Sequence, residues 1–438
     1  MALGMRLLDS MALVLTACLV GCSGGGTIST PEDLQGVLAS ATAGERVCLP
    51  EGIFEGSFDV PAGVVLCGAG VGLTRLVGPP GQPTLRLTPG DATRPTTVTT
   101  LSVQSNGDYG IRAVGPGDVN LVDLEVIVPT AGAGIGVESL TALRLRNVDV
   151  RGPVTPVSAG LACAEADISV VPTHGVVAVL VESVEGSEVD ISGFSHAGML
   201  AVSSGLALTD SYMTANFKAG LVVFGGTADL RNVTIGAARE GAIFAGGADV
   251  NTSNLSVSGS ETVGILQSQA TVTHTDLLAE ANAEGALLVQ NSGGFAVTNG
   301  VVRNNGLTGI AALSSSGVSL VRAEITNTTL GDGIELLGST TGVTLERVGL
   351  SDNARVGILF DLEGESFDGT GIQSIDIAGT GTQLGAIALN GDIVPGWDAN
   401  IRRSDIVADN DSAFTGTLRA FGTPISWDAC TEPPHGLP

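Results

Sequence analysis

One short phrase recurs along most of the chain and restricts the fold more than any other feature. It is eight residues long and alternates apolar residues with others around a central polar residue, as in the copies that begin at Leu143, Ala228 and Val250. The central residues, here called pivots, are Asp123, Asn147, Asp167, Glu188, Asp210, Asn232, Asn254, Asp276, Asn299, Arg322 and Arg347. They follow one another at steps of 20 to 25 residues. A fixed period of this size is the mark of a solenoid.

The phrase has the geometry of two short strands that bend at the pivot. Asn and Asp tolerate the left-handed conformation that such a corner requires. Stacked pivots such as Asn232 and Asn254 can share side-chain hydrogen bonds along the axis.

A second mark, Gly followed by an aliphatic or small apolar residue, comes about ten residues after most pivots. These glycines are Gly110, Gly134, Gly198, Gly220, Gly241, Gly264, Gly285, Gly309, Gly333, Gly357 and Gly385. We expect each to supply the turn before a third strand. Each repeat then has three strands, and strands of neighbouring repeats pair in parallel with right-handed crossovers as the default. The pattern therefore predicts an all-β, right-handed parallel β-helix solenoid over residues 30–410. A C-terminal cap or tail follows at 411–438.

The composition agrees with thin layers of small side chains. The chain has 63 glycines and only 3% aromatic residues, where a large globular core would use more Phe and Trp. Its formal charge is −26, with Lys218 as its single lysine. Such a surface argues against nucleic acid and against electrostatic binding to anionic lipid. The acidic residues are scattered, which is typical of a solvated surface, and we expect a monomer.

The N-terminus is read as a targeting segment over residues 1–21. Arg6 precedes an apolar run at 11–20 that is short for a bilayer span. The run ends in Leu19-Val20-Gly21-Cys22, which resembles the lipobox of bacterial lipoproteins. The resemblance implies cleavage before Cys22, acylation of Cys22, a Gly-rich tether at 22–29 and, because Ser23 follows, an outer-membrane location facing the periplasm or the cell surface. The alternative is an ordinary cleaved secretory leader.

The next segment predicts a helical cap at 30–43. Thr30 can cap the helix, Pro31 suits its first position, and an apolar stripe follows before Gly44. The residues after it are similar to the opening of pectin-lyase-like right-handed parallel β-helices; the matching residues are Ala43-Gly44-Glu45, Val47, Leu49-Pro50-Glu51-Gly52, Val65-Leu66 and Gly68-Ala69-Gly70. The resemblance implies that fold. A helix at this end would cover the apolar side chains and unpaired backbone of an open solenoid.

Four further cysteines remain after the leader. Cys48 and Cys67 lie 19 residues apart in two short strands, on the outward side of each, so they should sit on adjacent rungs. Strand spacing of about 4.8 Å suits a disulfide, and an exported protein meets oxidising conditions; we predict Cys48–Cys67. For Cys163 and Cys430 two possibilities stay open: a second pair, which requires the tail to fold back, or two separate thiols.

One set of polar residues precedes successive Gly marks and is a candidate site: His174, His196, Lys218, Arg239 and Glu240. Stacking would place them in one column at steps of about 5 Å, where they could offer a general base and cations to an anionic sugar. The alternative is that exposed turns simply collect polar residues.

Known catalytic patterns of polysaccharide-degrading β-helices are absent. Asp332 lies about seven rungs from His174, too far for the paired carboxylates of glycoside hydrolysis. No dense acidic cluster repeats on neighbouring rungs, so we predict no metal site and no cofactor. The sequence therefore favours a lipid-anchored β-helix with a structural, adhesive or carbohydrate-binding role; the alternative is a polysaccharide lyase or hydrolase that acts on an anionic glycan.

Overall fold

The computed structural model describes residues 28–130, 132–153, 173–239, 241–367, 372–378, 385–393 and 406–408, and beyond residue 361 it describes the backbone alone. Several sequence predictions lie outside these residues. They are the leader and tether with Cys22, the pivot Asp167, Cys163, Glu240, and the tail with Cys430.

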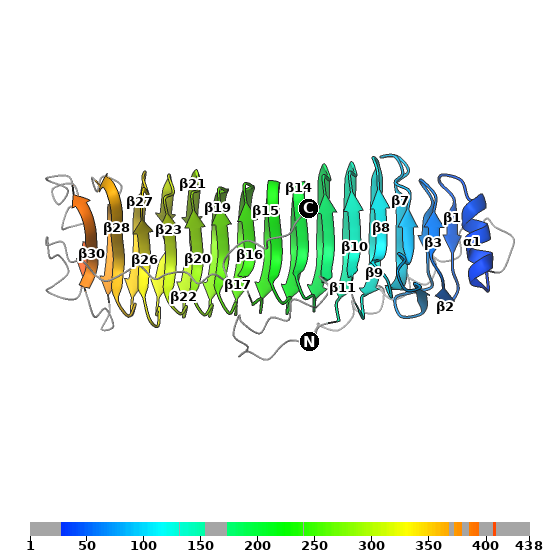
Figure 1. Cartoon of the computed structure of the whole chain (residues 1–438), viewed down its shortest axis with the longest axis horizontal. Helices are drawn as coiled ribbons and strands as arrows, with labels where there is room; N and C mark the ends of the chain where they lie inside the picture. Colours follow the sequence, from blue (N-terminus) through cyan, green and yellow to red (C-terminus); the bar gives the residue numbers. More distant parts are fainter. Residues whose placement is uncertain are drawn as a thin grey trace, which may run out of the picture.

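The described chain forms one rod in which strands stack along the long axis (Figure 1). Helix α1 (Pro31–Ser40) closes one end. All pairings between named strands are parallel, and in the middle of the rod the step is 22 residues, as in Thr227–Asp249 and Asp249–Thr271. A single apolar core runs inside from Leu34 to Phe360. The parallel β-solenoid that the repeat predicts is thus confirmed.

The strands fall into two kinds. Pivot strands bend at a pivot, flank one, or pair in the same row at either end of the rod: β7 (Thr96–Gln104), β9 (Asp118–Ile127), β11 (Ala142–Arg151), β13 (Ser183–Ser192), β14 (Ala197–Thr214), β15 (Ala219–Gly236), β17 (Asp249–Ser258), β19 (Thr271–Glu280), β21 (Gly294–Thr298), β22 (Val301–Arg303), β24 (Val318–Val321), β25 (Glu324–Thr326), β27 (Thr344–Ser351), β29 (Ile372–Ala378) and β31 (Ile406–Ala408). Third-row strands have a glycine within their first three residues, in most of them a Gly mark: β8 (Tyr109–Val114), β10 (Gly132–Glu138), β12 (Thr173–Val179), β16 (Gly241–Gly246), β18 (Val263–Ser268), β20 (Gly285–Gln290), β23 (Thr308–Leu313), β26 (Asp332–Leu337), β28 (Val356–Phe367) and β30 (Gly385–Ile393). In β14 and β15 the third row runs directly into the pivot strand. The first rungs are shorter: β1 (Arg46–Cys48), β2 (Gly52–Glu55), β3 (Phe58–Val60), β4 (Val65–Cys67), β5 (Thr74–Val77) and β6 (Leu85–Leu87).

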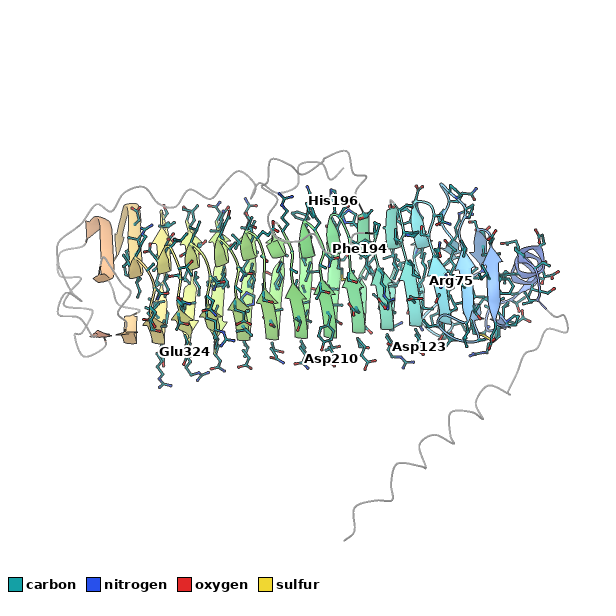
Figure 2. All side chains as sticks on the ribbon, turned by 90° about the horizontal axis from the view of Figure 1, so that it is seen from below. Arg75, Asp123, Phe194, His196, Asp210 and Glu324 are labelled. Atoms are coloured by element: carbon teal, nitrogen blue, oxygen red, sulfur yellow. A yellow bond between two sulfur atoms is a disulfide. The ribbon has the colours of Figure 1, made fainter. Side chains whose placement is uncertain are left out.

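The pivots form the predicted corner ladder. Every pivot within the described residues has a φ between 49° and 57°, the left-handed region. The Asn254 side chain donates to Asn232 at 2.9 Å, and Asn232 donates to Asp210 at 2.9 Å. Figure 2 shows Asp123 and Asp210 along one edge of the rod, with His196 on the opposite side. The ladder offsets part of the cost of the left-handed backbone, because each shared amide hydrogen bond contributes about 1 kcal/mol.

A second ladder of asparagines lies inside the rod, six residues after a pivot, and the sequence analysis missed it. Its members are Asn216, Asn282, Asn305 and Asn353, all at most 1% exposed. Asn216, for example, accepts from the backbone of Phe194 and donates to the carbonyl of Ile191. These amides satisfy backbone groups at the second corner of the rung, where secondary-structure pairing leaves them without partners.

Gly241 has a φ of +155°, as a turn glycine would, but most of the Gly marks have a different cause from the one that the sequence suggested. Gly309 and Gly333 lie inside the third row with ordinary φ, so they supply no turn. A Cβ on Gly309 would come within 2.5 Å of the Gly333 carbonyl oxygen on the next rung, and a Cβ on Gly333 within 2.7 Å of the Gly357 oxygen. The stacked positions of these glycines form a column along the rod. Because Ala219 pairs with Gly241, the residue in this column is Ala242 on one rung and Ala286 on another, each one residue after the glycine of the Gly mark. The column is therefore small because neighbouring rungs approach closely.

The N-terminal cap has the local structure that its sequence indicates. Thr30 accepts from the Asp33 backbone while the Asp33 carboxylate accepts from the Thr30 backbone, a reciprocal capping box. Leu34 and Leu38 are fully buried against the first rung. Cys48 pairs with Cys67 in adjacent strands, and a disulfide joins them with a Cα–Cα distance of 4.5 Å. Among the described residues, no helix has the length and apolar character needed to cross a membrane.

Candidate functional site

The structure brings part of the predicted polar column together. His174 at the start of β12 and His196 just before β14 lie with their ring centroids 5.5 Å apart. On the next rung the Lys218 backbone donates to the His196 carbonyl at 3.1 Å. These three residues occupy successive rungs on one side of the rod.

Arg239 does not belong to this column. Its backbone donates to the Phe217 carbonyl, which places it one residue out of register with Lys218. Its guanidinium lies 5.0 Å from the centre of the Phe217 ring, and its Nε lies 3.3 Å from Glu261 Oε2. The side chain is only 7% exposed. Arg239 therefore packs and pairs within the wall of the solenoid. Glu240 lies outside the described residues.

Both histidines are weak bases in this environment. Burial lowers the pKa of His174 to about 4, helped by the neighbouring His196. Burial also lowers the pKa of His196 to about 4, helped by the positive charge of Lys218. The hydrogen-bond partner of His196 in the described residues is the Ser195 hydroxyl, at 3.4 Å from Nδ1. A general base works best with a pKa near the operating pH, so neutral imidazoles with such low pKa values are poorly suited to abstract a proton at pH 7.

We predict that neither imidazole titrates near neutrality. Because burial disfavours the imidazolium, both rings should stay neutral from pH 8 down to about pH 5 and take up a proton only near pH 4. The measurement is a ¹H–¹³C NMR titration with His174→Gln and His196→Gln used to assign the signals. A midpoint at the ordinary value of 6.5 for either ring would contradict this environment.

A pair of buried carboxyl groups lies farther along the same side of the rod, on β26. Asp332 Oδ2 lies 3.2 Å from Arg355 Nη2, and Asp332 Oδ1 accepts from the Val356 backbone. Burial, together with the nearby Asp332 charge, raises the pKa of Glu335 to about 8. Seven rung steps separate β26 from β12. At about 4.8 Å per step, these carboxyls cannot share a substrate bond with His174.

A groove on the outer face of the pivot strands has a more accessible set of polar groups. Its volume is about 560 Å³, within the usual range for ligand sites. Residues from four successive rungs line it: Asn120, Val122, Arg144, Leu145, Arg146, Glu185, Gly186, Ser187, Ala207 and Thr209. The hollow arises because long side chains on β11 stand beside short ones on β13 and β14, as the register Arg146–Ser187–Thr209 shows.

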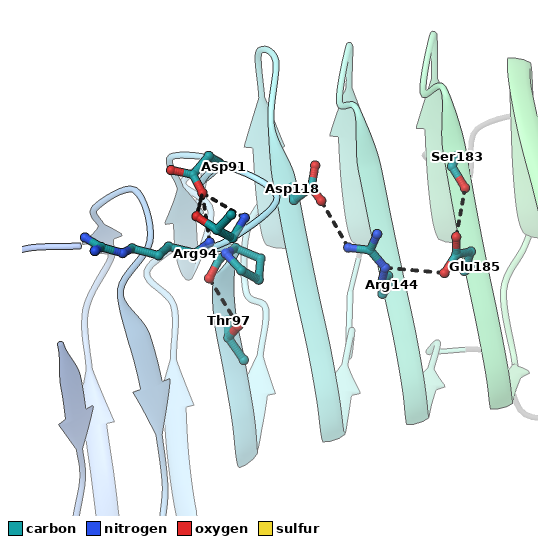
Figure 3. A network of polar contacts seen from close by, with 9 residues as sticks. Asp91, Arg94, Thr97, Asp118, Arg144, Ser183 and Glu185 are labelled. Atoms are coloured by element: carbon teal, nitrogen blue, oxygen red, sulfur yellow. Dashed lines mark hydrogen bonds and ion pairs between the residues drawn. The ribbon is translucent and has the colours of Figure 1, made fainter. Parts of the chain in front are cut away.

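An ion-pair network fixes one wall of the groove (Figure 3). Arg144 Nη1 lies 3.1 Å from Asp118 Oδ2, and Arg144 Nε lies 3.3 Å from Glu185 Oε2. The Ser183 hydroxyl donates to Glu185 at 3.3 Å. Asp118 is almost fully buried, so its ion pair fixes the Arg144 guanidinium against the wall of the groove. Arg146, two residues along β11, is exposed and lines the groove.

The groove offers hydroxyl, amide, guanidinium and carboxylate groups within one surface. These are donors and acceptors that sugar hydroxyls can use, at both signs of charge. The sequence analysis missed this site, although two arginines separated by one residue in a pivot phrase are a visible signal. Within the described residues, no three His, Cys, Asp or Glu side chains come together to hold a metal ion.

The fold defines a class of proteins rather than an activity. A family model described as a right-handed beta helix region matches residues 174–330. The chain is similar to the A-module of mannuronan C-5 epimerase AlgE4 from Azotobacter vinelandii, at 15% identity and a TM-score of 0.37, covering 88% of this chain and 92% of that one. It is also similar to the N-terminal fragment of bacteriophage phi29 gene product 12, at 13% identity and a TM-score of 0.48, covering 91% and 73%.

A third solved structure is the catalytic unit of a thermostable α-1,3-glucanase from Streptomyces thermodiastaticus. It is 13% identical with a TM-score of 0.41, and the match covers 92% of this chain and 67% of that one. No curated protein sequence matches the chain. The family model agrees with a right-handed β-helix over the residues that it matches, and the function has to be argued from the site.

Proposed function

We propose that this chain is a non-catalytic β-helix that binds a polysaccharide in the groove between β9 and β14. The observation that carries the proposal is the Asp118–Arg144–Glu185 network beside the exposed Arg146. It presents fixed donors and acceptors along several rungs, and a groove that crosses rungs suits an extended chain of sugars. The opposing charges of Arg144 and Glu185 favour a hydroxyl-rich glycan of low charge density over a densely anionic one.

A lyase or hydrolase has less support. The His174–His196 pair supplies neutral, weakly basic rings. The carboxyl pair Asp332 and Glu335 lies close enough together for glycoside hydrolysis, but both side chains are at most 1% exposed, so a sugar chain does not reach them. The proposed lipoprotein leader adds a location to this function. An acylated Cys22 would hold the groove at the outer membrane of the producing cell. Metabolic labelling with a palmitate analogue tests the acylation, with Cys22→Ala as the control.

Binding to a glycan array followed by calorimetry tests the groove. We expect Arg146→Gln to weaken binding about tenfold, equivalent to about 1.4 kcal/mol, because one charge-assisted hydrogen bond is lost. Arg231→Gln is the matched control, since Arg231 occupies the same outer column one rung beyond Thr209 and does not line the groove. Equal losses in both variants, or binding that neither variant affects, would overturn the groove assignment.

A further inference from the structure

The two tyrosines of the chain have different environments. The Tyr109 ring lies against Gly136 on the next rung, where an added Cβ would clash with it, and the Arg112 guanidinium lies 5.0 Å from the centre of that ring. The Tyr212 side chain is 53% exposed, and within the described residues no hydrogen bond or ring contact holds it. Tyr109 thus packs within the solenoid, while Tyr212 presents a large ring that the fold itself does not use.

Tyr212 stands on the outward side of β14, two residues after the pivot Asp210. Its neighbours Ser211 and Met213 are 0% exposed, so the alternation of the strand directs Tyr212 away from the core. The register gives the residues stacked with it, which we call the Tyr212 column: Glu125, Asp149, Asp190, Tyr212, Thr234, Ser256 and Leu278. Tyr212 is the one aromatic residue among them.

The carboxylate next to the ring in this column is not neutralised by an ion pair. Arg151 lies 3.1 Å from Glu125 and also pairs with Asp149. Asp190, which is in register with Tyr212, has no ion pair or side-chain hydrogen bond in the part of the chain that the structure describes. Partial burial, together with the charge of Asp149, raises the pKa of Asp190. The Asp190 oxygens are therefore available as acceptors beside the Tyr212 ring.

Short hydroxyl side chains lie on the other sides of the ring. Thr234 follows Tyr212 on the next rung, and Ser192 and Thr214 stand in the adjacent outward column, where Gly236 brings no side chain. The three hydroxyl residues are half-buried, and among the described residues their hydroxyls have no partner. Asp190 and Thr234 are two rung steps apart, about 10 Å at 4.8 Å per step. This patch is comparable in size to one sugar ring with its substituents.

We propose that the Tyr212 ring and the Asp190 carboxylate bind one neutral pyranose ring of a glycan, with the three hydroxyls at its rim. We call this the Tyr212 subsite. A pyranose has a face of C–H groups and a rim of hydroxyls. Its C–H face packs on the exposed phenol ring, which offers a large apolar surface. Its hydroxyls donate to Asp190, and a hydrogen bond to an ionised acceptor is about twice as strong as one between neutral groups.

The Tyr212 subsite is separate from the groove, although β14 contributes to both. The groove reaches Ala207 and Thr209 on this strand. The strand then bends at Asp210, which has a φ of 49° and lies along the edge of the rod (Figure 2). The two surfaces therefore lie on different sides of that edge. The subsite rests on the proposed function only for its class of ligand, a glycan.

A lysine-rich peptide is the alternative ligand that an aromatic ring beside a carboxylate can bind. The hydroxyls around the ring favour the sugar. An ammonium group only donates hydrogen bonds, so it would use Asp190 and leave the hydroxyl hydrogens of Ser192, Thr214 and Thr234 without acceptors. A sugar hydroxyl both donates and accepts, so one pyranose can satisfy the carboxylate and the hydroxyls together.

Fluorine NMR of the full-length chain labelled with 3-fluorotyrosine tests the subsite, because the chain has only two tyrosines. Tyr109→Phe identifies the Tyr212 signal. The probes are cellotetraose, xylotetraose, maltotetraose and laminaritetraose. We expect at least one of them to shift the Tyr212 signal saturably and to leave the Tyr109 signal in place, because only Tyr212 contacts the sugar.

Calorimetry with the same tetraose, in the Arg146→Gln background, measures the contribution of the ring. Tyr212→Ala should weaken binding about tenfold, because the stacking surface is lost. Tyr212→Phe keeps the ring and should keep the affinity. Leu278→Ala is the matched control, since it shortens another outward side chain of the Tyr212 column three rungs farther on, and it should leave the affinity unchanged.

The outcomes separate this subsite from the groove. A Tyr212 shift that persists with Arg146→Gln supports the subsite, whether or not that substitution weakens glycan binding elsewhere. A shift that Arg146→Gln abolishes would assign the effect to the groove and overturn the subsite. No shift with any of the four tetraoses would overturn it too, and would leave the groove to its own test. A larger, salt-sensitive shift with tetralysine than with every tetraose would show a site for cations and contradict the proposal.

Discussion

Gly309→Ala is expected to lower the free energy of unfolding by about 3 kcal/mol, at the upper end of the usual range for overpacking. The added Cβ would lie 2.5 Å from both the Gly333 carbonyl oxygen and Ile325 Cγ2. The first of these is backbone that is already paired between β23 and β26. Relief would require separating two rungs, which weakens every pairing on either side. The measurement is urea unfolding followed by far-ultraviolet circular dichroism.

Gly293→Ala is the matched control for this substitution. A Cβ at Gly293 meets no atom within 4 Å, and its φ is not in the left-handed region. The control should therefore change stability by less than about 0.5 kcal/mol. Equal stability of the two variants would show that neighbouring rungs do not approach at Gly309 as described.

Asn305→Leu is expected to destabilise the rod by about 3 to 5 kcal/mol. Asn305 is fully buried and makes four hydrogen bonds: it accepts from the backbone and the side chain of Asn282, and it donates to the carbonyls of Ala279 and Arg303. Leucine has a similar size and leaves these groups without partners in an apolar interior. Each orphaned buried group costs about 1 to 3 kcal/mol.

The same urea titration measures this effect. Asn251→Leu, at an exposed outward position of β17, is the matched control and should lie within about 0.5 kcal/mol of the wild type. The larger loss should appear in the rungs between β19 and β25, because a solenoid is stabilised mainly by contacts between neighbouring repeats. A loss for Asn305→Leu no greater than that of the control would contradict a structural role for the inner asparagines.

Features of the fold that depend on one residue and its neighbours in sequence were predictable. Pivots such as Asn254 are polar residues between alternating apolar ones, and each has the left-handed φ that the pattern indicates. The N-terminal helix starts at its capping box for the same reason. The alternation also identified the two cysteines that the disulfide joins, because 19 residues return the chain to the adjacent strand.

Features that depend on contacts between rungs were not predictable in this way. The Gly column was recognised but assigned to turns, because the close approach of Gly309 to Gly333 exists only once the rungs are stacked. The predicted site was assembled by counting residues back from each Gly mark, but the register between rungs is set by strand pairing. The pairing places Ala242 and Ala286 in the Gly column, and the same one-residue shift takes Arg239 out of the predicted site. The groove beside Arg146 likewise depends on which short side chains the next two rungs place next to it.

Product analysis after glycan binding tests the central proposal most directly. Polysaccharides that bind the wild-type protein are incubated with it for much longer than binding takes to reach equilibrium. Chain length, new reducing ends and unsaturated uronic acid residues are then measured. The proposed function predicts saturable binding that Arg146→Gln weakens, with every glycan recovered at its original length. Shortened or unsaturated chains that disappear with His196→Gln would contradict a non-catalytic role and would assign the chemistry to the His174–His196 side of the rod.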